Sequence, residues 1–470
     1  MINNLYVFAI GGTGARVLRS LTMLLAAGVE MKANRIVPII IDPDEGCGST
    51  SETVTLMNLY QDIYSALSHT GSLEAFNTEI KKLPFPNDYV LPLCGNIKTP
   101  FEDYIDYANM SKENQALMNM LFSEENLQTR MDKGFLGNPN IGSVVLNQFS
   151  KSEEFKKFAT EFSEKDGIFI ISSIFGGTGA SGFPLLLKNI RTIGDVANAA
   201  LLKTAKIGAV SVMPYFNLDD ITVDGKDSVI KSDTFMQKTK AALSYYEKNM
   251  GQLEVLYYIG DDDRKAQSNV EGGARQQNKA HFVELASALA VFDYAESWEK
   301  LVSKKCLYKE FGIESKKSDK ITFTDLCKKT YSQIAERMTE LALASKFMRD
   351  ALDDSTSQTW YGNYTNVSQN DFDSFTQKYL DWLDEMSEID RGTTFVPFSL
   401  DDTPNDVFGF VNNVKTKRVA SLKSNWDLAN DRLNDVSPSA VTKAAKDTEG
   451  RFAAHVMLAM KRLVKEKINL

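Results

Sequence analysis

The segment that decides the fold class reads LYVFAIGGTGARVLRSLTMLLAA and covers residues 5–27. Its first six residues are apolar, which predicts a buried β-strand. The glycine-rich turn Gly11–Gly14 follows directly, and apolar residues then recur at helical spacing from Ala15 to Ala27. A glycine loop between a strand and a helix lets backbone N–H groups approach phosphate oxygens, although it also serves as a plain tight turn.

The same alternation of strands and helices continues to about residue 300. Further strands are expected at Ile36–Ile41, Gly167–Ser172, Lys206–Met213 and Leu253–Ile259. Helical patterns lie between them, for example at Pro184–Ile190 and Phe235–Met250. Short apolar strands that alternate with helices are typical of a parallel sheet covered on both faces. The sequence therefore predicts an α/β fold built on a parallel sheet.

Two domains are expected, with a boundary near residue 300. The first, residues 1–300, is the α/β domain, and it contains a helical insertion at about 45–130 with helices predicted at Leu56–Leu67 and Leu117–Met131. After Trp298 the sequence is dominated by amphipathic helical patterns. Residues 301–470 are therefore expected to form a mainly helical C-terminal domain.

Composition and charge exclude several classes of protein. Of the 470 residues, 43% are hydrophobic and 24% are charged, as in ordinary globular proteins. The net charge of -9 argues against broad nucleic-acid binding. Four cysteines without a C-x-x-C pair and three histidines give no pattern for a zinc site. With no apolar run of membrane-spanning length and no basic leader at Met1–Leu5, we expect a soluble, cytoplasmic protein without a membrane span.

A second glycine loop raises the case for phosphate binding. It reads IFGGTGASG at residues 174–182, and it again follows a predicted strand and opens a helix. Between the two lies Gly134–Gly142, whose glycines and proline predict a loop. A dinucleotide-binding fold needs only one such loop. Several loops of this kind suggest convergence on a di- or triphosphate.

At these loops the chain resembles the tubulin/FtsZ superfamily, in a divergent bacterial branch. Gly11–Gly14 resembles the first phosphate loop of FtsZ, and Asp42-Pro43-Asp44 lies where the second loop follows its strand. Gly137–Gly142 matches the G-N-P-x-I-G loop that faces the γ-phosphate. Gly176–Gly182 resembles the G-G-G-T-G-[ST]-G signature, with Phe175 at its first glycine.

Two further loops complete the ordered set, which covers about residues 5–296. Met213–Phe216 resembles the ribose-side loop, and Ile259–Asp262 lies where the family has I-P-N-D beside the purine. The resemblance implies that GTP or GDP binds with Mg²⁺. The implied nucleotide-binding residues are Gly11, Gly12, Thr13, Gly14, Asp42, Gly137, Asn138, Gly176, Gly177, Thr178, Gly179, Ala180, Ser181, Pro214, Asp261 and Asn278.

The base-side residues depart from the family. Asp261 replaces an asparagine, and a carboxylate can accept from guanine N1–H and N2–H but would repel adenine N1. Guanine is therefore the expected base. A helix is expected to begin near Gln277, and Asn278 resembles the base-contacting asparagine of the family's central helix. An ordinary helix N-cap is an equal interpretation of Asn278.

Asp293 and Glu296 are the catalytic candidates. The sequence Asp293-Tyr294-Ala295-Glu296 resembles the D-F-A-D of the FtsZ loop at the far end of the central helix. The resemblance implies that these carboxylates polarise water at the γ-phosphate of a neighbouring subunit, so that hydrolysis accompanies head-to-tail polymerisation. Glu299 is a rival candidate, and a solvated acidic helix face is the other interpretation.

Three functions follow as hypotheses. The first is a GTP-binding protein that self-associates through its nucleotide face, with hydrolysis completed by a neighbouring subunit. The second is a nucleotide-binding scaffold or switch without hydrolysis, which recruits protein partners through the insertion and the C-terminal helical domain. The third is an NAD-dependent oxidoreductase with Asp42 on the ribose, although Val17 stands at the usual third glycine.

Overall fold

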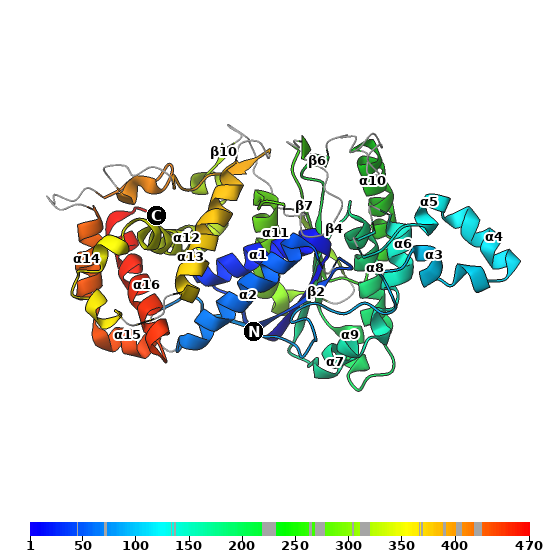
Figure 1. Ribbon diagram of the computed structural model, residues 1–470, viewed down its shortest axis with the longest axis horizontal. Helices are drawn as coiled ribbons and strands as arrows, with labels where there is room; N and C mark the ends of the chain where they lie inside the picture. The colour runs from blue at the N-terminus through cyan, green and yellow to red at the C-terminus, as the bar shows by residue number, and fades with distance from the viewer. Residues whose placement is uncertain are drawn as a thin grey trace.

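The fold centres on one seven-stranded sheet in which the strands run parallel (Figure 1). The computed structural model describes residues 1–44, 46–69, 73–132, 134–135, 138–218, 232–262, 266–267, 278–302, 305–310, 320–365, 367, 370–388, 392–400, 407–417 and 425–470. The sheet order is β3-β2-β1-β4-β5-β7-β9. Its strands are β1 (Ile2–Ile10), β2 (Ala33–Ile41), β3 (Glu79–Ile80), β4 (Gly167–Ser173), β5 (Ile207–Val212), β7 (Val255–Ile259) and β9 (Leu307–Glu310). The predicted α/β class is confirmed.

The central strands are buried on both faces, as continuous apolar runs require. Every residue of β4 and β5 is buried. Helices α1 (Gly11–Ala27), α2 (Gly48–Ala66) and α11 (Phe282–Ser297) pack together on one face. Helix α8 (Gly177–Thr192) covers the other face and packs against α6 (Pro139–Leu146), α9 (Ala199–Thr204) and α10 (Ser232–Asn249) (Figure 1). Such double coverage accounts for the lack of polar alternation in these strands.

A helical hairpin projects from the α/β layers at one end of the molecule (Figure 1). It contains α3 (Phe101–Tyr104), α4 (Lys112–Leu121) and α5 (Glu124–Leu127). The prediction of one helix over Leu117–Met131 is wrong, because Ser123 ends the run and caps α5 by accepting the N–H of Asn126. In contrast, α2 and β3, which fall within the predicted insertion, belong to the α/β layers.

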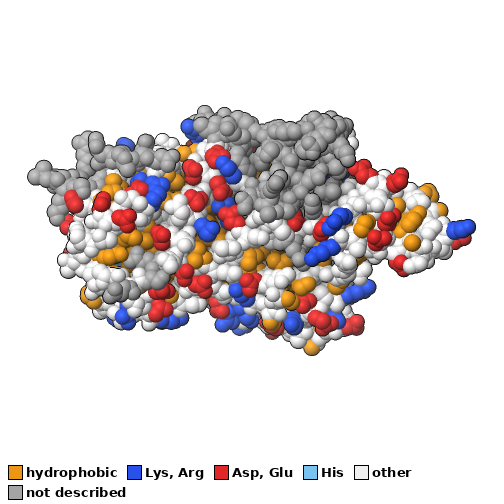
Figure 2. Space-filling model, viewed as in Figure 1, with side chains coloured by type: hydrophobic (Ala, Val, Ile, Leu, Met, Phe, Trp, Pro, Cys, Tyr) orange, Lys and Arg blue, Asp and Glu red, His pale blue; other side chains and the backbone are white. Residues whose placement is uncertain are grey.

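The surface of this hairpin carries apolar side chains. Figure 2 shows hydrophobic side chains on the projecting end of the molecule. On α4, Leu117, Met120 and Leu121 are exposed, and none of the ten residues of this helix is buried. Their i, i+3 and i+4 spacing places them on one face of the helix.

The C-terminal region is mainly helical, as predicted. It comprises α12 (Lys328–Asp350), α13 (Asn370–Ser387), α14 (Asn425–Asp435), α15 (Pro438–Ala444) and α16 (Thr448–Lys467), with short strands β10 (Lys320–Ile321) and β11 (Thr394–Phe395). Helix α12 packs against α13, α16 and α1. An ion pair of 2.7 Å between Arg19 and Glu385 also joins α1 to α13. Among the described helices, none is both long and apolar enough to cross a membrane.

Candidate functional site at the carboxyl edge of the sheet

The two glycine loops lie side by side at the carboxyl edge of the sheet. Strands β1 and β4 are direct neighbours, with Ile10 opposite Ser172, and each leads into its glycine loop. A Cβ placed on Gly11 would stand 3.4 Å from Cβ of Thr178. The chain runs outward from β1 to β2 and β3, and then returns to the other side of β1 at β4. Such a reversal creates the crevice in which open α/β sheets bind ligands.

Helices α1 and α8 begin in these loops with their first N–H groups free of side-chain caps. Neither helix has a capping side-chain hydrogen bond or an acidic residue in its first turn. Helix α7 (Glu153–Glu161) and α16, by comparison, are capped by Ser152 and Asp447. The first N–H groups of a helix lack partners inside the helix and carry partial positive charge. Two adjacent helix starts of this kind form an arrangement that is suited to bind an anion.

Close packing requires glycine at two of these positions. A Cβ on Gly14 would lie 2.7 Å from the carbonyl carbon of Ala9, so α1 could not approach β1 as it does. A Cβ on Gly179 would collide with the backbone of Ser173. The loops are thus held against the ends of their strands, which brings their N–H groups to one place.

Not every predicted donor of the second loop is open to a ligand. The N–H of Ala180 donates to the carbonyl oxygen of Gly176 at 3.1 Å. The hydroxyl of Ser181 donates to the carbonyl oxygen of Gly177 at 2.6 Å. Both groups serve the first turn of α8. The N–H groups of Gly177, Thr178 and Gly179 lie at the start of the helix, where partners within a helix are absent.

The third loop approaches the same edge through α6. Asn138 is the N-cap residue of α6, and Gly142 packs against Ser181 of α8. The predicted loop over Gly134–Gly142 is too long, because a helix already begins at Pro139, where proline fits the first helical position. Gly137 lies outside the described residues.

Asp42 is buried at the end of β2, beside the first loop. Its carboxylate accepts the N–H of Asp44 at 3.1 Å and the hydroxyl of Thr50 at 3.2 Å. Burial raises the pKa of Asp42 to about 7, against the smaller lowering effect of these hydrogen bonds. Its predicted contact with a ribose stays a prediction.

A buried polar network at this edge was not foreseen from the sequence. Arg16 on α1 donates from Nε to Oε1 of Glu284 at 2.6 Å and from Nη2 to the hydroxyl of Tyr215 at 2.8 Å. Tyr215 in turn donates to Oε1 of Glu284 at 2.6 Å. Burial disfavours the charge of Arg16, but Tyr215 and Glu284 outweigh burial and raise its pKa. Arg16 and Glu284 are 268 positions apart, and no sequence pattern links them.

The predicted ribose-side loop, Met213–Phe216, contributes to this network through Tyr215. Pro214 accepts the N–H of Asp261 at 3.5 Å, so the two loops predicted to lie beside the ribose and the base are in contact. The carboxylate of Asp261 accepts the N–H of Thr393 at 3.2 Å and lies 4.0 Å from Nε2 of His281. Asp261 is therefore already engaged with the C-terminal region.

The start of α11 differs from its prediction. The helix begins at Phe282 rather than near Gln277, because His281 caps it with Nδ1 and Glu284 completes the capping box. Asn278 lies three positions before this cap and is partly exposed, so the N-cap interpretation of Asn278 is wrong. Its contact with a base stays a prediction.

Asp293 and Glu296 lie at the opposite end of α11, away from the glycine loops. A 16-residue helix spans about 24 Å. Asp293 accepts hydrogen bonds from Tyr257 (2.7 Å), Lys309 (2.6 Å) and Lys329 (3.0 Å). Burial alone would raise the pKa of Asp293, but these three donors outweigh it and hold the pKa below its ordinary value.

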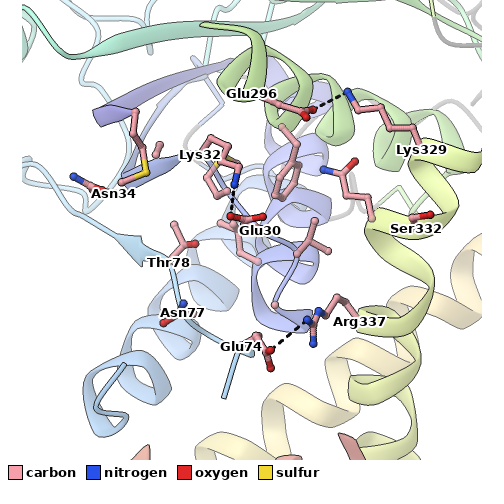
Figure 3. Close-up of a pocket in the computed structure, with 18 residues that line it drawn as sticks. Glu30, Lys32, Asn34, Glu74, Asn77, Thr78, Glu296, Lys329, Ser332 and Arg337 are labelled. Carbon is pink, nitrogen blue, oxygen red and sulfur yellow. Dashed lines mark hydrogen bonds and ion pairs between the residues drawn. The ribbon is translucent and has the colours of Figure 1, made fainter. Parts of the chain in front are cut away.

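Glu296 lines a cavity of about 780 Å³ at the amino edge of the sheet (Figure 3). In Figure 3 the cavity lies between the loop after α1, the segment around Thr78, the end of α11 and the start of α12. The cations labelled there are ion-paired: Lys32 with Glu30, Lys329 with Glu296 at 2.7 Å, and Arg337 with Glu74 at 3.3 Å. This charge balance makes the cavity a poor phosphate site.

The similarity of this chain to known proteins lies in its fold and was found among solved structures. No protein-family model matches the chain, and no curated protein is similar to it in sequence. Among solved structures, CetZ2 from Haloferax volcanii, a GTPγS-bound protofilament, has 12% identity and a TM-score of 0.31 over 63% of this chain and 59% of its own. The empty FtsZ dimer of M. jannaschii has 15% identity and a TM-score of 0.27 over 65% and 57%. The chain thus spans less than two thirds of either structure, and scores this low do not establish a family.

Proposed function

We propose that the chain binds a guanine nucleotide at the carboxyl edge of the sheet and self-associates through that face. The observation that carries this proposal is the meeting of two glycine-rich helix starts without side-chain caps, at the point where the strand order reverses. Phosphate oxygens would accept from the first N–H groups of α1 and α8. Asn138 would border the terminal phosphate.

The choice of guanine rests on the ordered loops that resemble the tubulin/FtsZ superfamily and on Asp261. A carboxylate accepts two adjacent donors from guanine and repels adenine N1. The described residues contain no group of three or more His, Cys, Asp or Glu side chains able to hold a metal. Mg²⁺ would be bound largely by phosphate oxygens and water, as is usual at nucleotide sites.

Hydrolysis would need a second subunit. Asp293 and Glu296 are a helix length away from the glycine loops of their own chain. Head-to-tail association would bring them to the nucleotide of a neighbour, where a carboxylate can orient the attacking water. GTP turnover would then depend on assembly.

The test begins with the nucleotide that purified protein releases on denaturation, identified by ion-exchange chromatography and mass spectrometry. GDP or GTP near one per chain is the expected result. GTP turnover per subunit is then measured over a wide range of protein concentration, and it should rise with concentration. Finding no guanine nucleotide bound or taken up under magnesium-rich conditions would overturn the proposal.

A nucleotide-binding scaffold without turnover is the second candidate. It is favoured by Asp293, whose charge is already balanced within the chain by Lys309 and Lys329. The exposed apolar face of α4 and the helical C-terminal region would then recruit protein partners. Under this function the nucleotide binds, but turnover is absent at every concentration and in the presence of assembled protein.

An NAD-dependent oxidoreductase remains a third candidate, because dinucleotide-binding folds share the strand order seen around β1 and β4. It assigns no ligand to the second glycine loop. Release of NAD in place of a guanine nucleotide would select it.

A further inference from the structure

The guanidinium of Arg16 lies directly against the first glycine loop. Arg16 is 4% exposed. Its Nη1 would stand 3.6 Å from a Cβ placed on Gly12. Nη1 makes no hydrogen bond with any described residue, whereas Nε and Nη2 are both engaged. One end of a deeply buried cation is thus directed at the backbone that forms the anion-binding arrangement.

Three partners hold the guanidinium in this orientation. Glu284 accepts from Nε, Tyr215 accepts from Nη2 at 2.8 Å, and Thr13 accepts from Nη2 at 3.3 Å. The planar fork of arginine has a fixed geometry, so these bonds determine where Nη1 points. Glu284 is fixed in turn, because its Oε2 accepts the N–H of His281 at 3.1 Å. The network therefore preorganises one donor.

Burying this ion pair is costly in itself. Two charges taken out of water lose solvation that their mutual attraction repays only in part, so a buried pair adds little to stability. Asp44 is buried nearby, just after the end of β2, and its carboxylate would repel an anion. A cation fixed against Gly12 offsets that repulsion at the place where phosphate would lie.

We propose that Nη1 of Arg16 donates a hydrogen bond to a phosphate oxygen of the nucleotide held by the glycine loops. This inference rests on the proposed function and names a phosphate ligand that the sequence motifs did not include. A bond from a guanidinium to a phosphate oxygen is charge-assisted and stronger than a neutral one. Arg16 would therefore recognise the phosphates and leave base recognition to other residues.

The experiment compares ligands that differ only in their phosphates. Dissociation constants for GDP and guanosine are measured by competition against a fluorescent GDP analogue, with guanosine taken to millimolar concentration. The test variant is Arg16→Met with Glu284→Met, which removes both buried charges together and so avoids leaving one unpaired. The matched control is Arg19→Met with Glu385→Met, which removes another arginine–glutamate ion pair of α1 but keeps Arg16 and its three partners. Circular dichroism and urea unfolding check that each variant folds.

The double variant is expected to bind GDP at least tenfold more weakly and guanosine within twofold of the wild type. Arg19→Met with Glu385→Met is expected to stay within threefold for both ligands. Equal losses for GDP and guanosine, or GDP affinity within threefold of the wild type, would overturn the role of Arg16. If the double variant fails to fold, a crystal structure of the wild type with GDP decides: Nη1 more than 3.5 Å from every phosphate oxygen refutes the contact. Wild-type protein that binds no nucleotide would instead refute the proposed function.

Discussion

The two edges of the central sheet differ in how their polar groups are satisfied. At the carboxyl edge, α1 and α8 begin without side-chain caps, and Nη1 of Arg16 points at the loop. At the amino edge, the cations around the cavity of Figure 3 already have carboxylate partners. Hydrogen-bond donors that have no partner within the protein are available to a ligand, whereas charged groups that are ion-paired within the protein have a structural role.

The largest effect is expected from Gly179→Val at the carboxyl edge. The added side chain would collide with the backbone of Ser173 and displace the start of α8. Guanine-nucleotide affinity should fall more than about 100-fold, the loss expected when an oriented phosphate site is disrupted. Binding of a fluorescent GDP analogue measures the loss. Gly194→Val is the control, because no atom lies within 4 Å of its Cβ position. Affinity within threefold of the wild type for Gly179→Val would show that the second loop is only a turn.

Arg16→Met tests how strongly the carboxyl edge depends on the buried ion pair between Arg16 and Glu284. The substitution leaves Glu284 buried without its cation, which should lower the free energy of unfolding by about 3–5 kcal/mol. Adding Glu284→Met should restore all but about 1 kcal/mol, the value of the lost capping bond at His281. Urea unfolding measures both. A double variant as unstable as the single one would show that packing, and not charge, dominates the network.

A pH dependence of intermediate size is expected from Asp42. Burial raises its pKa to about 7, so the folded protein keeps this proton from about pH 4 to pH 7 while the unfolded chain releases it. Stability should therefore fall as pH rises through this range, by at most about 4 kcal/mol. Asp42→Asn should flatten the profile, as measured by urea unfolding from pH 4 to 8.

Glu340 on α12 gives the matched case in the C-terminal region. Burial raises its pKa to about 7 as well, against the lowering effect of Arg337. Glu340→Gln should remove a separate part of the same pH dependence. For Asp42, an unchanged dependence of stability on pH in Asp42→Asn would contradict a protonated Asp42 at the carboxyl edge.

The smallest effect is expected at the amino edge, from Glu296→Gln. Glu296 and Lys329 are both about half exposed, and exposed ion pairs contribute about 1 kcal/mol or less. Nucleotide affinity of the isolated subunit should not change, because Glu296 is a helix length from the glycine loops. A loss of nucleotide affinity in monomeric protein would contradict the separation of the two edges.

The sequence predicted the elements whose signal is local. The apolar runs at Ile36–Ile41 and Gly167–Ser172 lie within β2 and β4, because an uninterrupted apolar stretch bounded by turns has few alternatives. Prediction failed where a capping residue determines the residue at which a helix begins. Ser123 divides the expected helix over Leu117–Met131, and His281 sets the start of α11.

The candidate site was predictable only in part. The glycine loops can be recognised in the sequence by their composition. They lie together in the structure because β1 and β4, the strands that precede them, are neighbours in the sheet. Asp293 was assigned from a motif, but its ties to Lys309 and Lys329 come from β9 and α12, which no local pattern connects to it. Roles in base or ribose recognition for Asp261, Asn278 and Asp42 stay predictions.

By itself, the sequence determined that this chain has an α/β fold with two glycine loops and a helical C-terminal region, because periodicity and turn residues act over a few neighbouring positions. Only the tertiary structure decided that the two loops meet at β1 and β4, and that Arg16 turns one nitrogen toward Gly12. Hydrogen bonds to Glu284 and Tyr215 set that orientation across hundreds of residues, and the free energy of such contacts depends on position in space rather than in the chain.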